Sequence, residues 1–188
     1  MATPIIAKDL QASFKLALLD AKAMRHEYLT LEHLLLALSK EAKTQKVLAA
    51  CGASVKRLRQ RLETFLKDTV EKLPEGVSAE PQQTIGIERV LQRAAIHALS
   101  AEQKVIDSGD VLVAMFREDE SHALYLLQQE GVTRLDLLNY LSHGITKGAD
   151  GEEDAEGQPS GPEEEGAPVR DPLTVSYTHL TLPTTPYV

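Results

Sequence analysis

The sequence TLEHLLLAL at residues 30–38 is echoed by SGDVLVAMF at residues 108–116. In both stretches a hydroxylated residue precedes an acidic residue and an aliphatic run, which is typical of a capped, buried helix. The separations are 78, 77, 79 and 79 residues for these stretches and for three further pairs, so one or two small insertions explain the drift. A duplication of this kind builds one compact domain from two similar halves and favours a binding scaffold. The three further pairs are Thr44 with Ser121, Gly52 with Gly131, and Ser54 with Thr133.

Hydrophobic residues at helical spacing predict an all-α fold of eight short helices and no strand. We expect two pseudo-twofold four-helix repeats, at about residues 5–70 and 84–146, within a domain that covers residues 1–146. Residues 71–86 are rich in proline and polar residues, which predicts an exposed connection between the repeats. The helices are predicted to begin at Thr3-Pro4, Thr30, Thr44, Ser54, near Ile87, and at Ser108, Ser121 and Thr133.

The composition argues against several classes of protein. The chain has 188 residues and a formal net charge of −8, but residues 1–146 hold 19 acidic and 18 basic residues. The predicted domain therefore lacks the basic face of a nucleic-acid-binding protein. No stretch approaches the roughly 20 apolar residues of a membrane helix. The first residues lack a signal-peptide pattern and the single cysteine, Cys51, fits a reducing compartment, so we expect a cytoplasmic protein with Cys51 in its core.

The C-terminal residues differ in composition from the predicted domain. Residues 147–174 consist largely of glycine, acidic residues, proline and serine, and we predict an acidic disordered linker. Residues 175–188 contain VSYTHLTLPTT, which looks like the in-frame translation of an adapter used in DNA sequencing. Our hypothesis is that this stretch is not native and that the true gene continues.

The motifs of common enzymes are absent from the sequence. It contains no G-x-x-x-x-G-K-S/T phosphate loop, no G-x-G-x-x-G and no H-E-x-x-H, and we predict that the chain is not an enzyme. His26-Glu27 and Glu32-His33 flank a predicted turn, but they do not form a closed metal-ligand set. We expect His26 and Glu27 to end one helix in solvent, and we predict no metal site.

Two further groups of charges suit a protein partner. In the duplicated pattern Glu32 corresponds to Asp110, so we expect paired, exposed carboxylates that would suit a cationic group. Arg89 and Arg93 lie four residues apart and share a helix face, where they could meet an acidic side chain of a partner. The alternative for each residue is an ordinary solvated helix charge.

Residues 25–38, RHEYLTLEHLLLAL, resemble the first Clp repeat of the Clp/Hsp100 family of AAA+ unfoldases. Residues 89–94, RVLQRA, together with VLVAMF at 111–116 and Ser142-His143-Gly144, resemble the ClpA branch. The resemblance covers about residues 5–146 and implies an eight-helix N-terminal domain on a flexible linker. In this family the domain docks the ClpS adaptor and contacts some protein substrates directly, and an ATPase ring then unfolds these substrates for the ClpP peptidase.

The resemblance also implies roles for individual residues. The adaptor-facing surface would include Glu27, Glu32, Thr84, Arg89 and Arg93. His26 matches a position that binds zinc in some relatives, but Lys67 stands where a carboxylate partner is expected. In the ClpC branch, acidic residues at the positions of Glu32 and Asp110 bind phosphoarginine, and Asp110 is one methylene shorter than the usual glutamate.

The ATPase modules of such an unfoldase are missing from this sequence. We therefore expect no cofactor in this chain, with ATP and Mg²⁺ needed only by the missing modules, and contact with ClpP only through them. We expect the chain to be a monomer. The alternative function is a stand-alone or ClpC-like module that binds phosphoarginine or peptides directly, and the sequence after residue 171 of the intact gene would distinguish the two.

Overall fold

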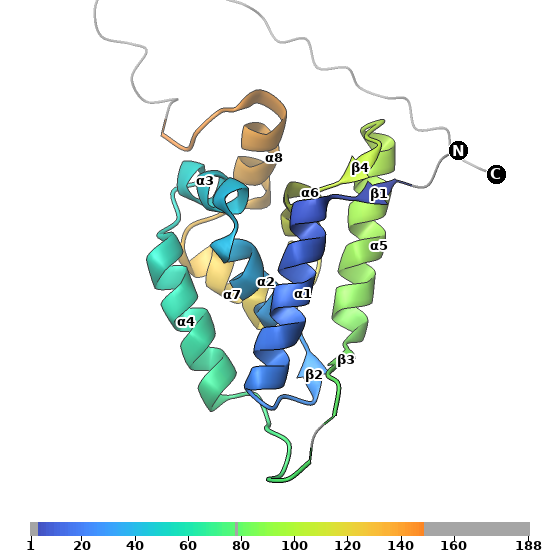
Figure 1. Cartoon of the computed structure of the whole chain (residues 1–188). Helices are drawn as coiled ribbons and strands as arrows, with labels where there is room; N and C mark the ends of the chain where they lie inside the picture. Colours follow the sequence, from blue (N-terminus) through green and yellow to red (C-terminus); the bar gives the residue numbers. More distant parts are fainter. Residues whose placement is uncertain (1–3, 78, 149–188) are drawn as a thin grey trace, which may run out of the picture. The chain divides into compact units, whose positions relative to one another are not determined.

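The computed structural model describes residues 4–77 and 79–148, which form eight helices and four two-residue strands (Figure 1). The predicted all-α fold is confirmed, although the sequence analysis missed the strands, because a two-residue strand is too short to show an alternating pattern. The helices are α1 (Lys8–Ala23), α2 (Leu31–Lys40), α3 (Ala42–Ala50), α4 (Val55–Asp68), α5 (Ile85–Ser100), α6 (Ser108–Met115), α7 (His122–Gln129) and α8 (Arg134–His143). The strands are β1 (Ile5–Ile6), β2 (Tyr28–Leu29), β3 (Gln82–Gln83) and β4 (Val105–Ile106).

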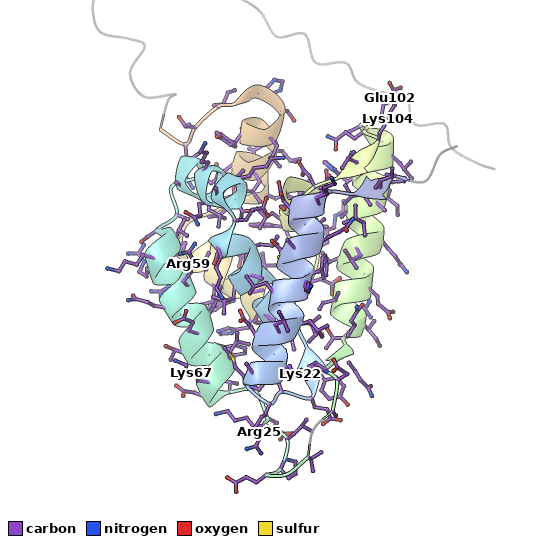
Figure 2. The ribbon with its side chains drawn as sticks, viewed as in Figure 1. Lys22, Arg25, Arg59, Lys67, Glu102 and Lys104 are labelled. Carbon is purple, nitrogen blue, oxygen red and sulfur yellow. The ribbon has the colours of Figure 1, made fainter. Side chains whose placement is uncertain are left out.

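A constant shift of 77 residue numbers relates the first half of one repeat to the first half of the other. Adding 77 to the bounds of α1 gives those of α5. The same shift relates Arg25 to Glu102, which have a positive φ of 61° and 55° and are the two such residues other than glycine in the described part of the chain. These two residues lie after α1 and after α5, at opposite ends of the view in Figure 2. The predicted pseudo-twofold duplication is thus confirmed down to the backbone conformation of single residues.

Each pair of strands joins one repeat to the other. β1 of the first repeat pairs in parallel with β4 of the second, and β2 of the first pairs in parallel with β3 of the second. In register, Ile5 faces Val105 and Tyr28 faces Gln82. A shift of 77 residue numbers relates Ile5 to Gln82 and Tyr28 to Val105. The two ladders are therefore related by the duplication, and in each of them a strand of one repeat pairs with a strand of the other.

Hydrogen bonds beside the ladders follow the same symmetry. The N–H of Ala7 donates to the carbonyl of Ile106 at 2.9 Å, and the N–H of Thr84 donates to the carbonyl of Leu29 at 3.2 Å. Ala7 and Thr84 are the N-cap residues of α1 and α5. The beginning of the first helix of each repeat is therefore fixed by the other repeat.

The core is built around α2 and α6. Every residue of α2 except Lys40, and every residue of α6, is buried. A helix that is buried on all sides lies in the middle of a domain. The contacts between the repeats come in symmetric pairs around these two helices, α3 with α8 and α4 with α7, and α2 with α7 and α3 with α6.

Four predicted helix starts were correct and three were wrong. Thr30, Ser54, Ser121 and Thr133 are N-cap residues as predicted. Thr3 lies outside the described residues, and α1 begins at Lys8 because Ile5 and Ile6 form β1 instead. Glu41, not Thr44, caps α3, and Thr44 is buried in its first turn. In addition, α5 begins at Ile85, two residues before the predicted start.

The third wrong start changes the alignment of the repeats. Asp107, not Ser108, caps α6, because its carboxylate accepts bonds from the N–H groups of Gly109 and Asp110. The hydroxyl of Ser108 instead donates to Glu41 Oε2 at 2.6 Å. With Asp107 as the counterpart of Thr30, Asp110 corresponds to His33, and the predicted equivalence of Glu32 and Asp110 is wrong by one residue.

The position that does correspond to Glu32 is occupied by Gly109. A Cβ atom there would lie 2.8 Å from Leu141 Cδ2, so any side chain would require Leu141 of α8 to move. The third helices, whose caps are Glu41 and Ser121, are 80 residues apart, so the second repeat has three extra residues between α6 and α7. The predicted pairing of Thr44 with Ser121 is therefore wrong as well.

The first residue of the predicted linker belongs to the folded unit. The N–H of Lys147 donates to the carbonyl of Ala50 at 2.8 Å, and its ammonium group contacts Asp136 at 3.0 Å. The remaining predictions for residues 149–174 and 175–188 lie outside the described residues.

Candidate functional site

A groove lies where the N-terminal ends of three helices meet. Thr30 precedes α2, Thr84 precedes α5 and Ser121 precedes α7, and all three line a cavity of about 250 Å³. We call it the repeat-junction groove, and its other lining residues are Leu31, Glu32, Gly86, Arg89, Glu118 and Glu120. Helix N-termini carry unpaired N–H groups and the positive end of the helix dipole, so the backbone here favours negatively charged groups.

Glu32 is buried and does not present the exposed carboxylate that was predicted. The residue is 7% exposed, and Oε1 accepts bonds from the N–H of Ala123 at 3.0 Å and from the hydroxyl of Ser121 at 3.3 Å. Glu32 of the first repeat therefore helps to cap α7 of the second. The carboxylate lines the groove while it also holds the two repeats together.

Arg89 and Arg93 share a face of α5, as predicted, and both contact a carboxylate of their own chain. Arg93 Nη1 contacts Glu118 Oε1 and donates to the carbonyl of Arg117 at 3.3 Å, while Arg89 Nη1 lies 3.6 Å from Glu118 Oε2. The sequence analysis gave Glu118 no role. It lies between α6 and α7, and the shift of 77 residues relates it to Glu41, which accepts a hydrogen bond from Ser108 instead of contacting two arginines.

Thr84 and Glu27 lie on either side of the β2–β3 ladder. The hydroxyl of Thr84 donates to the carbonyl of Leu29 at 3.2 Å, and the carbonyl of Glu27 accepts from the N–H of Gln82 at 2.9 Å. The Glu27 side chain is exposed, and its charge raises the pKa of the adjacent Tyr28. The structure thus brings Glu32, Thr84 and Arg89 together in the groove and joins Arg93 to it through Glu118. Glu27 lies outside its lining.

Asp110 lies in the second repeat and does not line this groove. It is 3% exposed, Oδ2 accepts from the N–H of Asp107 at 2.9 Å, and Oδ1 lies 2.8 Å from His97 Nδ1. The expectation of a pair of exposed carboxylates is therefore wrong, because both Glu32 and Asp110 are buried and hydrogen-bonded within the chain.

His26 is completely buried, whereas the sequence analysis placed it in solvent. His33 Nδ1 accepts from the N–H of Thr30 at 3.2 Å, so the proton of neutral His33 is on Nε2, which donates to His26 Nδ1 at 2.7 Å. This leaves His26 Nε2 buried without a hydrogen-bond partner among residues 4–77 and 79–148. Burial, followed by the positive charge of Lys72, lowers the pKa of His26, and burial and His26 lower the pKa of His33 to about 4. The pair therefore favours the neutral state.

No group of three or more His, Cys, Asp or Glu side chains that could hold a metal ion occurs within residues 4–77 and 79–148. Lys67 lies exposed near the C-terminal end of α4 (Figure 2). Cys51 is buried in the core, as predicted, and burial raises the pKa of its thiol to about 11. None of the described helices is long and apolar enough to cross a membrane.

Comparison with known proteins identifies relatives of about three quarters of the chain. A curated protein of Fuscovulum blasticum named ClpA homolog is 40% identical over 145 residues, which is 77% of this chain and 18% of the relative. The chain therefore spans less than a fifth of that relative's length.

Solved structures share the fold at low sequence identity. The Hsp104 N-terminal domain from Candida albicans covers 76% of this chain and 94% of its own, with 11% identity and a TM-score of 0.62. A ClpV N-domain in complex with a VipB peptide covers 73% and 85%, with 21% identity and a TM-score of 0.59. A model of the Clp repeat (R) N-terminal domain family matches residues 6–130. Since this match covers more than half of the 188 residues, the chain belongs to the Clp repeat N-terminal domain family.

Proposed function

We propose that this chain is the docking domain of a ClpA-type Clp/Hsp100 unfoldase, which recruits a ClpS-type adaptor and protein substrates. The observation that carries the proposal is the repeat-junction groove, which gathers Glu32, Thr84 and Arg89, three of the five residues that the family resemblance implies. The ClpA homolog at 40% identity supports the branch. The ClpV N-domain that was solved with a VipB peptide supports peptide docking by this fold.

The groove suits a partner that carries charges of both signs. Arg89 and Arg93 share the single carboxylate of Glu118, so a partner carboxylate can pair with either guanidinium group. The exposed side chain of Glu27, beyond the groove, can meet a basic residue. Glu32 is a positioning residue, because it holds the N-terminus of α7 at the groove.

A titration of the full chain with a ClpS-type adaptor by calorimetry tests the proposal. We expect Glu27→Lys and Arg89→Glu each to weaken binding by about tenfold or more, since each reverses a charge at the surface. Glu75→Lys and Lys46→Glu are matched controls, because they reverse exposed charges elsewhere and should bind like the parent chain. An absence of binding, or equal losses in the controls, would contradict the proposal.

The alternative, direct recognition of phosphoarginine at Glu32 and Asp110, has less support. Both carboxylates are buried and already accept hydrogen bonds from the chain. Titration with free phosphoarginine separates the two functions. Binding that is lost in Asp110→Asn would favour the alternative, because that variant removes the charge and keeps the shape.

The activity of the whole protein is part of the same proposal. We propose that ATP hydrolysis, unfolding and delivery to ClpP belong to further modules of the whole protein, because the family match at residues 6–130 is to the Clp repeat N-terminal domain. We propose that the chain itself is a monomer that hydrolyses neither ATP nor peptides. Light scattering tests the first statement, and turnover measurements on the purified chain test the second.

A further inference from the structure

A second groove, which Arg93 lines, lies between α5, α6 and the first residue of α8. Its volume is about 350 Å³, and it shares no lining residue with the repeat-junction groove. We call it the arginine groove, because Arg93, Arg117 and Arg134 line it together with Ile96, His97 and Val113.

The arginine groove carries an excess of positive charge. None of the described residues that line it is Asp or Glu. Arg93 contacts Glu118, which is 11% exposed and also contacts Arg89, so one carboxylate serves two arginines. Arg117 and Arg134 are exposed, and neither lies within 4.0 Å of a carboxylate in the described part of the chain. Two guanidinium groups are therefore available to an acidic ligand, and the planar guanidinium group suits bidentate pairing with a carboxylate.

The floor of the same groove is apolar. Val113 and Ala114 of α6 line it and are 2% and 4% exposed, and Ile96 of α5 is 62% exposed at its edge. A large exposed aliphatic residue beside a buried aliphatic floor favours contact with an apolar side chain. A phosphate or a polyanion alone would leave this surface uncovered.

We propose that the arginine groove binds an acidic peptide segment in which carboxylates flank one apolar side chain. The carboxylates pair with Arg117 and Arg134, and the apolar side chain lies on the floor beside Ile96. The position of Arg93 is fixed by Glu118 and by the carbonyl of Arg117, so the wall of the groove is formed before the ligand arrives. This inference does not rest on the proposed adaptor surface, because no residue of that surface other than Arg93 lines the groove.

A fluorescein-labelled peptide with one leucine between glutamates tests the proposal in a fluorescence-anisotropy titration of the full chain. We expect Arg117→Glu/Arg134→Glu to weaken binding by more than about tenfold, and we expect a peptide with serine in place of leucine to bind less tightly. Lys46→Glu/Lys56→Glu is the matched control, because it changes the net charge equally at exposed lysines of α3 and α4. The control variant should bind like the parent chain.

Several results would overturn the proposal. Equal weakening in the control variant would show that only the net charge matters. Displacement of the peptide by inorganic polyphosphate as effective as that by unlabelled peptide would show a general anion surface. Circular dichroism verifies folding, and Arg117→Gln/Arg134→Gln replaces the reversed variant if that variant unfolds. Because Arg93 is left intact, the adaptor titration should be unaffected by these changes, which keeps the two proposals separable.

Discussion

His97 on α5 and Asp110 on α6 form a pair, with 2.8 Å between Nδ1 and Oδ1, whose residue types are reversed in the first repeat. The positions 77 residues earlier hold Asp20 and His33. There Asp20 pairs with Lys40 at 2.7 Å, and its charge partly opposes the lowering of the pKa of His33. The duplicated fold therefore keeps an acid and a histidine between the first two helices of each repeat and exchanges their places.

We expect Asp110→Ala to destabilise the domain by about 1–2 kcal/mol, since it removes the partner of the Asp107 N–H and of His97. Asp110→Asn keeps an acceptor oxygen and should cost less. Urea unfolding measures both changes. Asp119→Ala alters an exposed acid nearby and should stay within about 0.5 kcal/mol of the parent chain. An equal effect at the two positions would show that the buried pair is unimportant.

We expect the free energy of unfolding to decrease as the pH is lowered from about 6.5 to about 4, because burial lowers the pKa of His33 to about 4. In this range His33 binds a proton in the unfolded chain but stays neutral in the folded chain. Its contribution to stability is therefore complete above pH 6.5 and is lost by about pH 4. The loss is on the order of 3 kcal/mol. Urea unfolding at several pH values measures it.

His33→Asn keeps an acceptor for the Thr30 N–H and should flatten this pH dependence. His143→Asn changes an exposed histidine and should leave it unchanged. Hydrogen bonds from Arg57 are the largest cause that lowers the pKa of Glu130, so the contribution of that carboxylate is lost only at a more acidic pH. A parent chain whose stability is constant from pH 7 to 5 would refute the assignment.

We expect Glu32→Ala to cost about 1–2 kcal/mol of stability, because α7 loses an acceptor at its N-terminus. Glu27→Ala changes an exposed side chain and should have almost no effect on the free energy of unfolding. Thermal unfolding distinguishes the two variants. The result matters for docking experiments, since a loss of adaptor binding in a Glu32 variant reports on folding as well as on contact. Equal unfolding temperatures for the two variants would contradict the buried role of Glu32.

We expect Ala7→Pro to cost about 0.5–1.5 kcal/mol, because it removes the N–H that donates to the carbonyl of Ile106. The φ of Ala7 is −57°, which proline adopts without strain, so the lost bond is the main effect. Lys8→Pro is the matched control. It places proline at the first helical position, where no intrahelical bond is made, and should be neutral or stabilising. Chemical denaturation compares the two variants, and equal stabilities would show that the inter-repeat bond contributes nothing.

Local signals allowed much of the fold to be predicted from the sequence. Ser54 and Thr133 cap helices because their hydroxyl groups reach an N–H in the first turn. Gly52 and Gly131 follow the ends of α3 and α7 with φ of 84° and 79°, a conformation that glycine adopts without strain. These features depend on a few neighbouring residues, and the sequence shows them directly.

Features that depend on distant contacts were not predictable in this way. Asp107 and Ser108 are both residue types that commonly cap helices, and the bond that Ser108 makes with the distant Glu41 is not visible in the local sequence. The burial of His26 depends on packing against residues 66–72, which no local pattern reveals. Of the site, the family resemblance supplied Glu32, Thr84 and Arg89. Glu118 appeared only once the fold placed it beside two arginines.

The exchange of strands between the repeats has a consequence for the origin of the domain. A chain of only residues 4–70 would contain β1 and β2 but neither of their partners, β4 and β3. Because each ladder is a copy of the other, two identical half-length chains could satisfy both by pairing with each other. We therefore expect an isolated half to be unfolded or dimeric, and fusion of two half-length genes that encoded such a dimer would produce the present arrangement.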